Sequence, residues 1–266
     1  MRALWNRLPL YLRAKAYRLR IALGSNAQTF GNPSYSEDGL HTDHICDFLQ
    51  DSTFVASYEF GNSSIGLETK TLDYNIRFRA YVATWAALQG AKKQGCFVEL
   101  GVGKAVVSGT IAKYFHLKGI ALPMFYLFDT FQGIPIAKLQ ESELGNARRL
   151  NILHYQNDYW EESKQKFQGF PEVHLVKGIL PDSLSLVNLE FVSFLHVDLN
   201  NAKSEIESAK VLWDKVVPGG IVLLDDYAFG EEYRAQKHAW DRFASTKRIE
   251  ILTLPTGQGL ILKDTK

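Results

Sequence analysis

The sequence predicts an α/β protein with a doubly wound, seven-stranded and mostly parallel sheet, helices on both faces, and an antiparallel hairpin at the C-terminal end. Three observations predict it. Short runs rich in Val, Ile, Leu and Phe alternate with longer helical runs, which is typical of parallel strands joined by crossover helices. The apolar runs are continuous, as strands covered on both faces require. The last two, 249–254 and 259–264, are separated only by Pro255 to Gln258, which is too short for a crossover and indicates a hairpin.

The elements follow one another regularly after residue 71. Apolar residues recur at mostly helical spacing over 71–93, which predicts a helix that packs on the sheet. The next elements are predicted in this order: strand 96–100, helix 104–115, strand 124–129, a long mixed segment, strand 173–178, strand 191–198, helix 204–216, strand 220–226 and helix 231–243. The mixed segment contains the aromatic and polar stretch 151–160, for which a cover over a substrate and a surface helix are equal alternatives.

Composition limits the size of the protein and its partners. A chain of 266 residues suffices for one large α/β domain with an N-terminal extension, and 46% apolar residues allow a substantial core. Thirty basic against 29 acidic residues leave a formal charge of +1, so no global field recruits nucleic acid. The two cysteines, Cys46 and Cys96, have no metal-ligand spacing, and a reducing cytoplasm is the simplest compartment.

The chain is predicted to divide into an N-terminal basic helix with a cap or lid segment, 1–70, and a main domain, 71–266. Residues 1–22 carry six basic and no acidic side chains, without the unbroken apolar stretch of a signal peptide or membrane span. One interpretation is adhesion to an anionic membrane surface, and the simpler one is a solvated helix or a helix that packs in a homo-oligomer. Residues 24–66 are rich in Gly, Asn, Ser and Asp, with one short helix predicted over 44–49.

The first candidate site follows strand 96–100, where Gly101 and Gly103 are separated by one residue. Ligands of open α/β sheets bind beyond the carboxyl ends of the strands, and glycines let the backbone turn tightly against a ligand. A dinucleotide fingerprint requires a third glycine where this chain has Val106, so pyrophosphate binding is disfavoured. Glu99 suits a ligand with an ammonium group, such as the methionine half of S-adenosylmethionine. An ordinary strand-to-helix turn is the alternative.

The next strand ends at Asp129, whose carboxylate can accept both hydroxyls of a ribose. The alternative role is a helix N-cap or an Asx-turn. Together, the glycine turn and this acid indicate a nucleotide-like cofactor, without separating NAD from S-adenosylmethionine.

Two later strands end in acids: Asp198 on one, and Asp225 with Asp226 on the next. If consecutive strands are neighbours, the carboxylates converge beside the cofactor, and like charges so placed need a compensating cation or a shared proton. Mg²⁺, which prefers oxygen ligands, would bind two substrate oxygens and lower the pKa of one hydroxyl. His196 or Asp198 would then take the proton. The alternatives are a helix cap at Asp198, a solvated turn at the aspartate pair and a core histidine at His196.

Five motifs, in order, resemble those of the macrocin and mycinamicin O-methyltransferases of the TylF/MycF type, a family of Rossmann-like class I S-adenosylmethionine-dependent methyltransferases. The motifs are FVELGVGKA at 97–105, LFDTFQGIP at 127–135, KGILPDSL at 177–184, HVDL at 196–199 and VVPGGIVLLDDY at 216–227. Together they span the chain from about residue 75 to its C-terminal end.

The resemblance implies transfer of a methyl group to a sugar hydroxyl with the help of Mg²⁺. It implies S-adenosylmethionine at Glu99, Gly101 and Asp129, and metal at Asp198, Asp225 and Asp226. We also expect cofactor contacts at Gly103, Thr130, Gly178 and Asp198. The family's D-L-Y-E-S is Asp-Leu-Asn-Asn-Ala over 198–202 here, so the substrate is left open. His196 stands where many members have an acid, which leaves the general base open.

The leading hypothesis is therefore an S-adenosylmethionine-dependent, Mg²⁺-assisted O-methyltransferase that acts on a sugar of a surface glycan or a glycosylated metabolite, as in polysaccharide biosynthesis. A lipid-linked acceptor would explain residues 1–22, which would hold a cytoplasmic enzyme at the membrane. The alternative within the class is a catechol-like small-molecule acceptor. From other classes, the alternatives are an NAD-dependent oxidoreductase and a non-catalytic nucleotide-binding protein, the latter because Asn200 and Asn201 replace family residues.

Overall fold

The computed structural model describes residues 33–63, 75–136, 139–155 and 158–264. The chain forms two compact units that divide between Asp47 and Phe48. In the first unit, β1 (Tyr35–Glu37) pairs antiparallel with β2 (Leu40–Thr42). Asp38 and Gly39 join the two strands with φ values of 54° and 74°, as a tight two-residue hairpin turn requires. Residues 1–22, for which a basic helix is expected, lie outside the described residues.

The second unit contains a seven-stranded sheet with the order β5-β4-β3-β6-β7-β9-β8. The strands are β3 (Cys96–Leu100), β4 (Phe125–Asp129), β5 (Val173–Lys177), β6 (Val192–Val197), β7 (Val216–Leu224), β8 (Leu252–Thr253) and β9 (Gly259–Leu262). Strands β3 to β7 pair in parallel, and β9 is antiparallel to both β7 and β8. The predicted α/β sheet and its C-terminal hairpin are confirmed.

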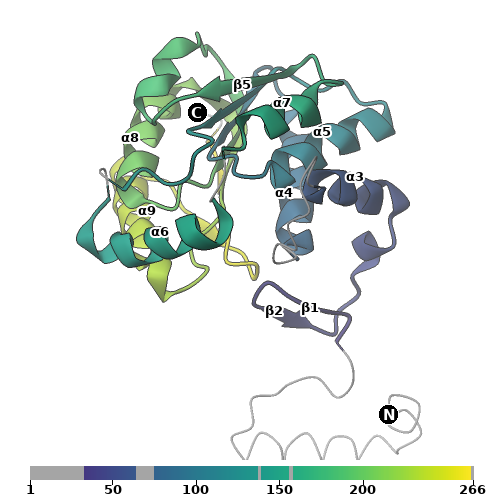
Figure 1. Cartoon of the computed structure of the whole chain (residues 1–266), viewed down its shortest axis with the longest axis horizontal. Coiled ribbons are helices and arrows are strands. Elements are labelled where there is room, and N and C mark those ends of the chain that lie inside the picture. Colours follow the sequence, from purple (N-terminus) through teal and green to yellow (C-terminus); the bar gives the residue numbers. More distant parts are fainter. Residues whose placement is uncertain (1–32, 64–74, 137–138, 156–157, 265–266) are drawn as a thin grey trace, which may run out of the picture. The chain divides into compact units, whose positions relative to one another are not determined.

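Helices cover both faces of this sheet (Figure 1). They are α3 (Ser52–Asn62), α4 (Arg77–Gly90), α5 (Val106–Lys118), α6 (Glu141–His154), α7 (Trp160–Phe167), α8 (Ala202–Leu212) and α9 (Arg234–Lys247), with short 3₁₀ turns at Asp47–Leu49, Asp182–Leu186, Trp213–Lys215 and Glu231–Tyr233. One buried cluster joins the sheet to α4, α5 and α7, and a second joins it to α8 and α9. The sheet is thus the middle of three layers, as its continuous apolar strands predict.

The structure contains a helix that the sequence pattern did not predict. The Asp51 carboxylate caps α3 by accepting hydrogen bonds from the backbone N–H groups of Thr53 and Phe54, at 2.8 and 3.3 Å. This helix packs against α5, where a Cβ on Gly61 would come within 2.3 Å of the Val106 carbonyl oxygen. The helix expected over 44–49 is only a 3₁₀ turn, and the long mixed segment forms α6 and α7.

The order of the strands reverses between β3 and β6. From β3 the chain runs outward to β4 and β5, then returns to β6 and β7 on the other side of β3. The carboxyl ends of β3 and β6 are therefore adjacent, with Leu100 opposite Val197. Such a switch point is where open α/β sheets bind their ligands, so the fold places a candidate site there.

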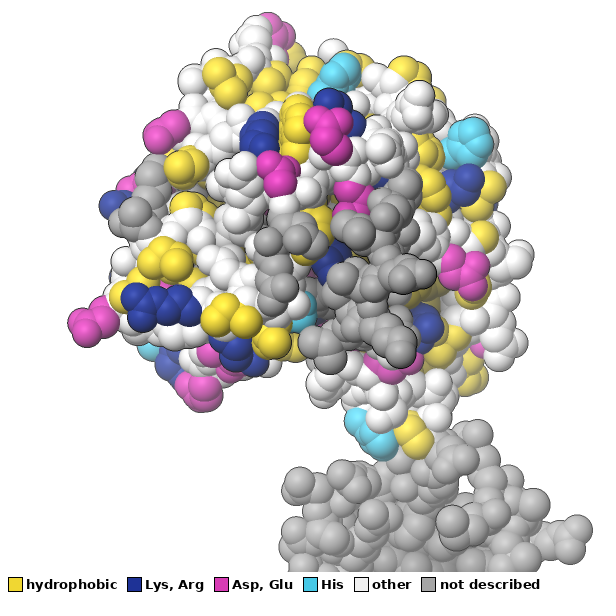
Figure 2. Space-filling model, in the orientation of Figure 1, with side chains coloured by type: hydrophobic (Ala, Val, Ile, Leu, Met, Phe, Trp, Pro, Cys, Tyr) yellow, Lys and Arg dark blue, Asp and Glu magenta, His cyan; other side chains and the backbone are white. Residues whose placement is uncertain are grey.

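Acidic and basic side chains are interspersed over the visible face of the described residues (Figure 2), in agreement with the small formal charge of the chain. None of the helices in the described part of the chain combines the length and the apolar character needed to span a membrane.

Candidate active site

The turn after β3 lies against the end of β6. Gly101 has a φ of 86°, which only glycine adopts without strain, and Gly103 has a φ of 50°. A Cβ on Gly101 would be 1.8 Å from the Asp198 carbonyl oxygen. The first glycine is therefore required by the close approach of two strand ends as well as by its own backbone.

Asp129, at the end of β4, holds the glycine turn in place. Its Oδ2 accepts hydrogen bonds from the backbone N–H groups of Val102 and Gly103, at 2.6 and 2.9 Å, while Oδ1 accepts one from Phe131 at 2.7 Å. The carboxylate thus serves the backbone of the turn in this structure. Oδ2 thus already accepts two hydrogen bonds, so the predicted contact with a ribose would fall on Oδ1. The Thr130 hydroxyl lies 3.3 Å from Oδ1 but makes a shorter hydrogen bond, of 2.6 Å, to the Gly133 carbonyl oxygen.

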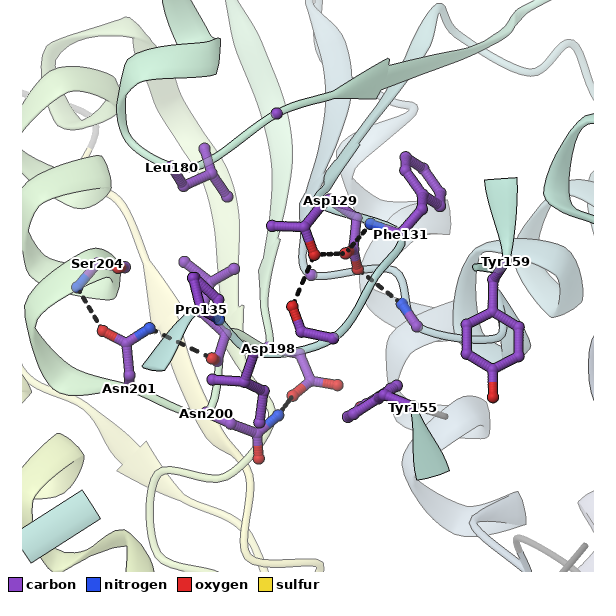
Figure 3. A pocket seen from close by; sticks show the side chains of 17 residues that line it. Asp129, Phe131, Pro135, Tyr155, Tyr159, Leu180, Asp198, Asn200, Asn201 and Ser204 are labelled. Atoms are coloured by element: carbon purple, nitrogen blue, oxygen red, sulfur yellow. Dashed lines mark hydrogen bonds between the residues drawn. The ribbon is translucent and has the colours of Figure 1, made fainter. Parts of the chain in front are cut away.

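An open cavity lies beyond these strand ends (Figure 3). Its lining includes six of the predicted cofactor residues: Gly101, Gly103, Asp129, Thr130, Gly178 and Asp198. In the view of Figure 3, Tyr155 and Tyr159 stand on one side, and Asn201 and Ser204 on the other.

The remaining lining residues were not among the predicted site residues. Tyr155 and Tyr159 belong to the stretch 151–160, where a cover over the substrate was one of two equal alternatives. Their aromatic side chains were the only sequence signal that these two residues line the cavity. Ile134, Pro135 and Leu180 add apolar surface, and only the tertiary fold brings them to the cavity.

Three carboxylates gather beside the cavity. Ligand atoms of Asp198, Asp225 and Asp226 all lie within 4.8 Å of one another. Asp198 lines the cavity, while Asp225 and Asp226 are 4% and 7% exposed. The prediction that these acids converge at the ends of neighbouring strands is thus met by their geometry.

A buried arginine, which the sequence analysis missed, contacts two of these acids. Arg79 of α4 donates from Nη1 to Asp225 Oδ2 at 2.5 Å and to Asp226 Oδ1 at 3.3 Å. Gln258, in the turn before β9, donates to Asp225 Oδ1 at 2.9 Å. The sequence signal for this contact was an arginine in the first turn of a mostly apolar helix. Only the fold shows which acids the arginine contacts.

Two predicted residues, Glu99 and His196, lie beneath the cavity, outside its lining. They are 2% and 1% exposed, and Glu99 Oε1 lies 2.9 Å from His196 Nδ1. His196 Nε2 is 3.6 Å from Asp225 Oδ1. Burial alone would lower the pKa of His196, but the carboxylates of Asp225 and Glu99 outweigh it and raise that pKa to about 10. The imidazole is therefore protonated at neutral pH.

The pKa values of two carboxyl groups in the cluster are shifted in opposite directions. Burial, followed by the neighbouring carboxylates of Asp225 and Asp226, raises the pKa of Asp198 well above its ordinary value. Burial acts in the same sense on Asp225, but Arg79 and His196 outweigh it and hold the pKa of that carboxyl below its usual range. Repulsion between close carboxylates thus raises mainly the pKa of Asp198, the acid that faces the cavity.

The acid cluster has the chemistry of a site for a hard divalent cation. Three carboxylates supply oxygen ligands, and a divalent charge would relieve the repulsion that raises the pKa of Asp198. Glu99 offers a second indication of a charged ligand, because its Oε2 is buried and makes no hydrogen bond within the described residues.

Comparison with known proteins agrees with this geometry. The sequence model of a family described as macrocin-O-methyltransferase (TylF) matches residues 76–253. Among solved structures, the O-methyltransferase NovP is similar with a TM-score of 0.65 at 17% identity, over 82% of this chain and 99% of NovP. The calicheamicin methyltransferase CalS11 is similar with a TM-score of 0.55 at 16% identity, over 82% of this chain and 94% of CalS11. Comparison with curated proteins gives no match.

Proposed function

Because the chain belongs to the macrocin-O-methyltransferase (TylF) family, we propose that it transfers a methyl group from S-adenosylmethionine to a sugar hydroxyl with the help of a divalent cation. The chain is an S-adenosylmethionine-dependent O-methyltransferase. Family membership therefore sets aside the oxidoreductase and the non-catalytic binding protein. The main support for a metal-assisted reaction is the cluster of Asp198, Asp225 and Asp226 beside the cavity, whose ligand atoms lie within 4.8 Å of one another.

In this proposal, each chemical group of S-adenosylmethionine meets a different set of residues in or beside the cavity. The backbone of Gly101 and Gly103 leaves space for the methionine half, and Oδ1 of Asp129 would accept a hydrogen bond from the ribose hydroxyls. The unpaired Oε2 of Glu99 would attract the ammonium group of the methionine. Thr130 and Gly178 also line the cavity and complete the proposed cofactor contacts.

Mg²⁺ is the proposed cation, held by Asp198, Asp225 and Asp226. Bound there, it would supply the Lewis acidity that lowers the pKa of an acceptor hydroxyl. Arg79 fixes the positions of Asp225 and Asp226 in advance through two hydrogen bonds. Of the two predicted proton acceptors, Asp198 is favoured, because it lines the cavity while His196 is buried outside the lining.

The proposed acceptor is a saccharide, either of a surface glycan or of a glycosylated metabolite. Support comes from the family, which is described by its action on macrocin, and from its resemblance to sugar O-methyltransferases. A lipid-linked saccharide remains part of the proposal because of the basic residues 1–22, which lie outside the described residues. Formation of a homo-oligomer through this segment is the alternative role and stays a prediction.

The metal proposal is tested by removing the ion and its ligands separately. We expect EDTA to abolish methyl transfer and Mg²⁺ to restore it, since the ion stabilises the charge that develops on the acceptor oxygen. Asp225→Asn should lower kcat by about 10²-fold or more. Asp214→Asn is the matched control, because Asp214 is an exposed acid with its side chain 86% accessible. An enzyme indifferent to EDTA, with an active Asp225→Asn variant, would refute metal assistance and leave the methyltransferase class intact.

The acceptor proposal is tested with S-adenosylmethionine labelled in its methyl group. Extracts fractionated by polarity serve as acceptors, and we expect label in saccharide-containing fractions. Incorporation only into apolar aromatic compounds would replace the sugar by the catechol-like acceptor.

A further inference from the structure

The turn after β3 adopts a conformation that its own residues do not fully support. Gly101 and Gly103 have positive φ values, and Ala105 follows with a φ of 57°, which is costly for a residue with a side chain. Ala105 is also the N-cap of α5, and its side chain makes no capping hydrogen bond. The turn therefore depends on groups outside it to keep its shape.

Asp129 is one such group, and a buried lysine is another. Lys166, in α7, donates from Nζ to the carbonyl oxygen of Lys104 at 2.8 Å, immediately before Ala105. Lys166 is 3% exposed, so water does not compete for this bond. The peptide group that leads into the strained residue is thus oriented by a side chain 62 positions later in the chain.

The same ammonium group binds the end of α3. It donates to the carbonyl oxygen of Gly61 at 2.7 Å. This carbonyl lies close because Gly61 and Gly109 let α3 and α5 touch: a Cβ on Gly109 would be 3.0 Å from the Gly61 Cα. Figure 1 shows α3 lying against α5. Carbonyl groups at a helix C-terminal end carry partial negative charge, which suits a cation.

A neutral side chain could fill the position of Lys166 at a smaller desolvation cost. Burial lowers the pKa of Lys166 to about 8, so the group keeps its charge at neutral pH. A buried charge with two carbonyl partners, one of them in the glycine turn, indicates a role in fixing geometry.

We infer that Lys166 is a positioning residue for S-adenosylmethionine: by joining the Lys104 and Gly61 carbonyl groups it holds the glycine turn in its binding conformation. Cofactor affinity then depends on α3, an element without a residue in the cavity lining. The inference rests on the proposed assignment of the glycine turn to the cofactor.

The test measures binding of S-adenosylhomocysteine by calorimetry to the full chain and two variants. We expect Lys166→Met to raise the Kd by about tenfold or more, as loss of a charge-assisted hydrogen bond implies. KM for S-adenosylmethionine should rise similarly, while KM for the acceptor stays unchanged. Lys164→Met is the matched control: Lys164 is an exposed lysine of the same helix that pairs with Glu161. It should bind the ligand as the wild type does.

Two further variants separate positioning from stability. Lys166→Arg keeps the charge and the donors and should recover part of the affinity. Gly61→Ala displaces α3 without removing the ammonium group and should weaken binding in the same way, which decides the question if Lys166→Met does not fold. An unchanged Kd in Lys166→Met or Gly61→Ala, with only a lower Tm, would overturn the inference. A wild-type chain that does not bind the ligand would instead overturn the cofactor assignment itself.

Discussion

At the scale of single residues, the site depends on backbone contacts that leave no space for a side chain. Gly101 combines a φ of 86° with an approach in which a Cβ would lie 1.8 Å from the Asp198 carbonyl oxygen. Moving a flexible side chain cannot relieve this clash, because the neighbouring atom belongs to the backbone of Asp198, the residue that follows β6. The glycine turn and Asp198, a proposed metal ligand, are therefore mechanically linked.

Gly101→Ala is expected to abolish cofactor binding and to reduce the free energy of unfolding by about 2–4 kcal/mol, as other strained backbone substitutions do. Denaturant unfolding and binding of S-adenosylhomocysteine measure the two effects. Gly145→Ala is the matched control, because Gly145 lies in α6 with nothing within 4 Å of a new Cβ. It should stabilise the chain by roughly 0.5–1 kcal/mol. Equal behaviour of the two variants would contradict the packing argument.

His196 makes the stability of the apo protein dependent on pH. Its pKa is raised from 6.5 to about 10, so its protonated form stabilises the folded state fully below pH 6.5. This contribution is lost as the pH rises toward 10. The difference in free energy of unfolding between the wild type and His196→Gln, measured in EDTA, should therefore narrow from pH 6 to pH 10. A difference that stays constant over this range would show that the histidine is not charged in the folded state.

The sequence could predict which residues end the strands, but not all of their partners. Gly101, Asp129, Asp198 and the aspartate pair follow from the rule that ligands lie beyond strand ends. The pairing of Glu99 with His196 depends on the register of β3 against β6, which places these two residues opposite each other. Register between distant strands is not encoded in either strand alone, and the same is true of the contacts of Arg79.

At the scale of elements, α6 is tied to the site by one carboxylate. Glu143 is 3% exposed; its Oε1 accepts a hydrogen bond from the Ala202 backbone N–H at 2.6 Å, and its Oε2 one from Gln140 at 3.0 Å. It thus caps the N-terminal end of its own helix and that of α8. The chain after α6 continues into Tyr155, which lines the cavity.

Glu143→Ala is expected to cost about 1–3 kcal/mol of unfolding free energy, because the buried Ala202 N–H and the partly buried Gln140 N–H lose their acceptor. It should also weaken binding of S-adenosylhomocysteine, since α6 and Tyr155 lose their attachment to α8. The measurements are urea unfolding and calorimetry. Glu141→Ala removes an exposed acid from the same first turn of α6 and should change neither quantity. Equal binding by the two variants would limit Glu143 to a capping role.

The strands were easier to predict than the helices that surround them. Continuous apolar runs identify β3, β4, β6 and β7 because each is buried on both faces. Helix α3 contains β-branched residues and a terminal glycine and follows a loop-like segment, so local preferences did not indicate it. Its stability comes from contact with α5, where Gly61 permits close approach. Tertiary packing therefore determines whether α3 forms, and this packing cannot be read from a single sequence.

At the scale of the whole molecule, the cavity is built by both halves of the sheet. β3, β4 and β5 supply Gly101, Asp129 and Gly178, while the end of β6 and α8 supply Asp198 and Ser204. A ligand that fills the cavity contacts both halves, so its binding free energy is shared between them. The unit from Phe48 onward should therefore respond to the cofactor as one cooperative body.

S-adenosylhomocysteine should therefore raise the thermal stability of this unit as a whole. At a concentration of about 100 times Kd, a ligand that binds only the folded state adds about 2.7 kcal/mol to its stability. For a unit of this size the midpoint should rise by roughly 5–11 °C. Because both halves of the sheet bind the ligand, hydrogen exchange should show added protection in β4 and in β6 alike. Two separate unfolding transitions, of which only one shifts with the ligand, would mean that the two halves of the sheet unfold independently. The ligand would then bind only one of them.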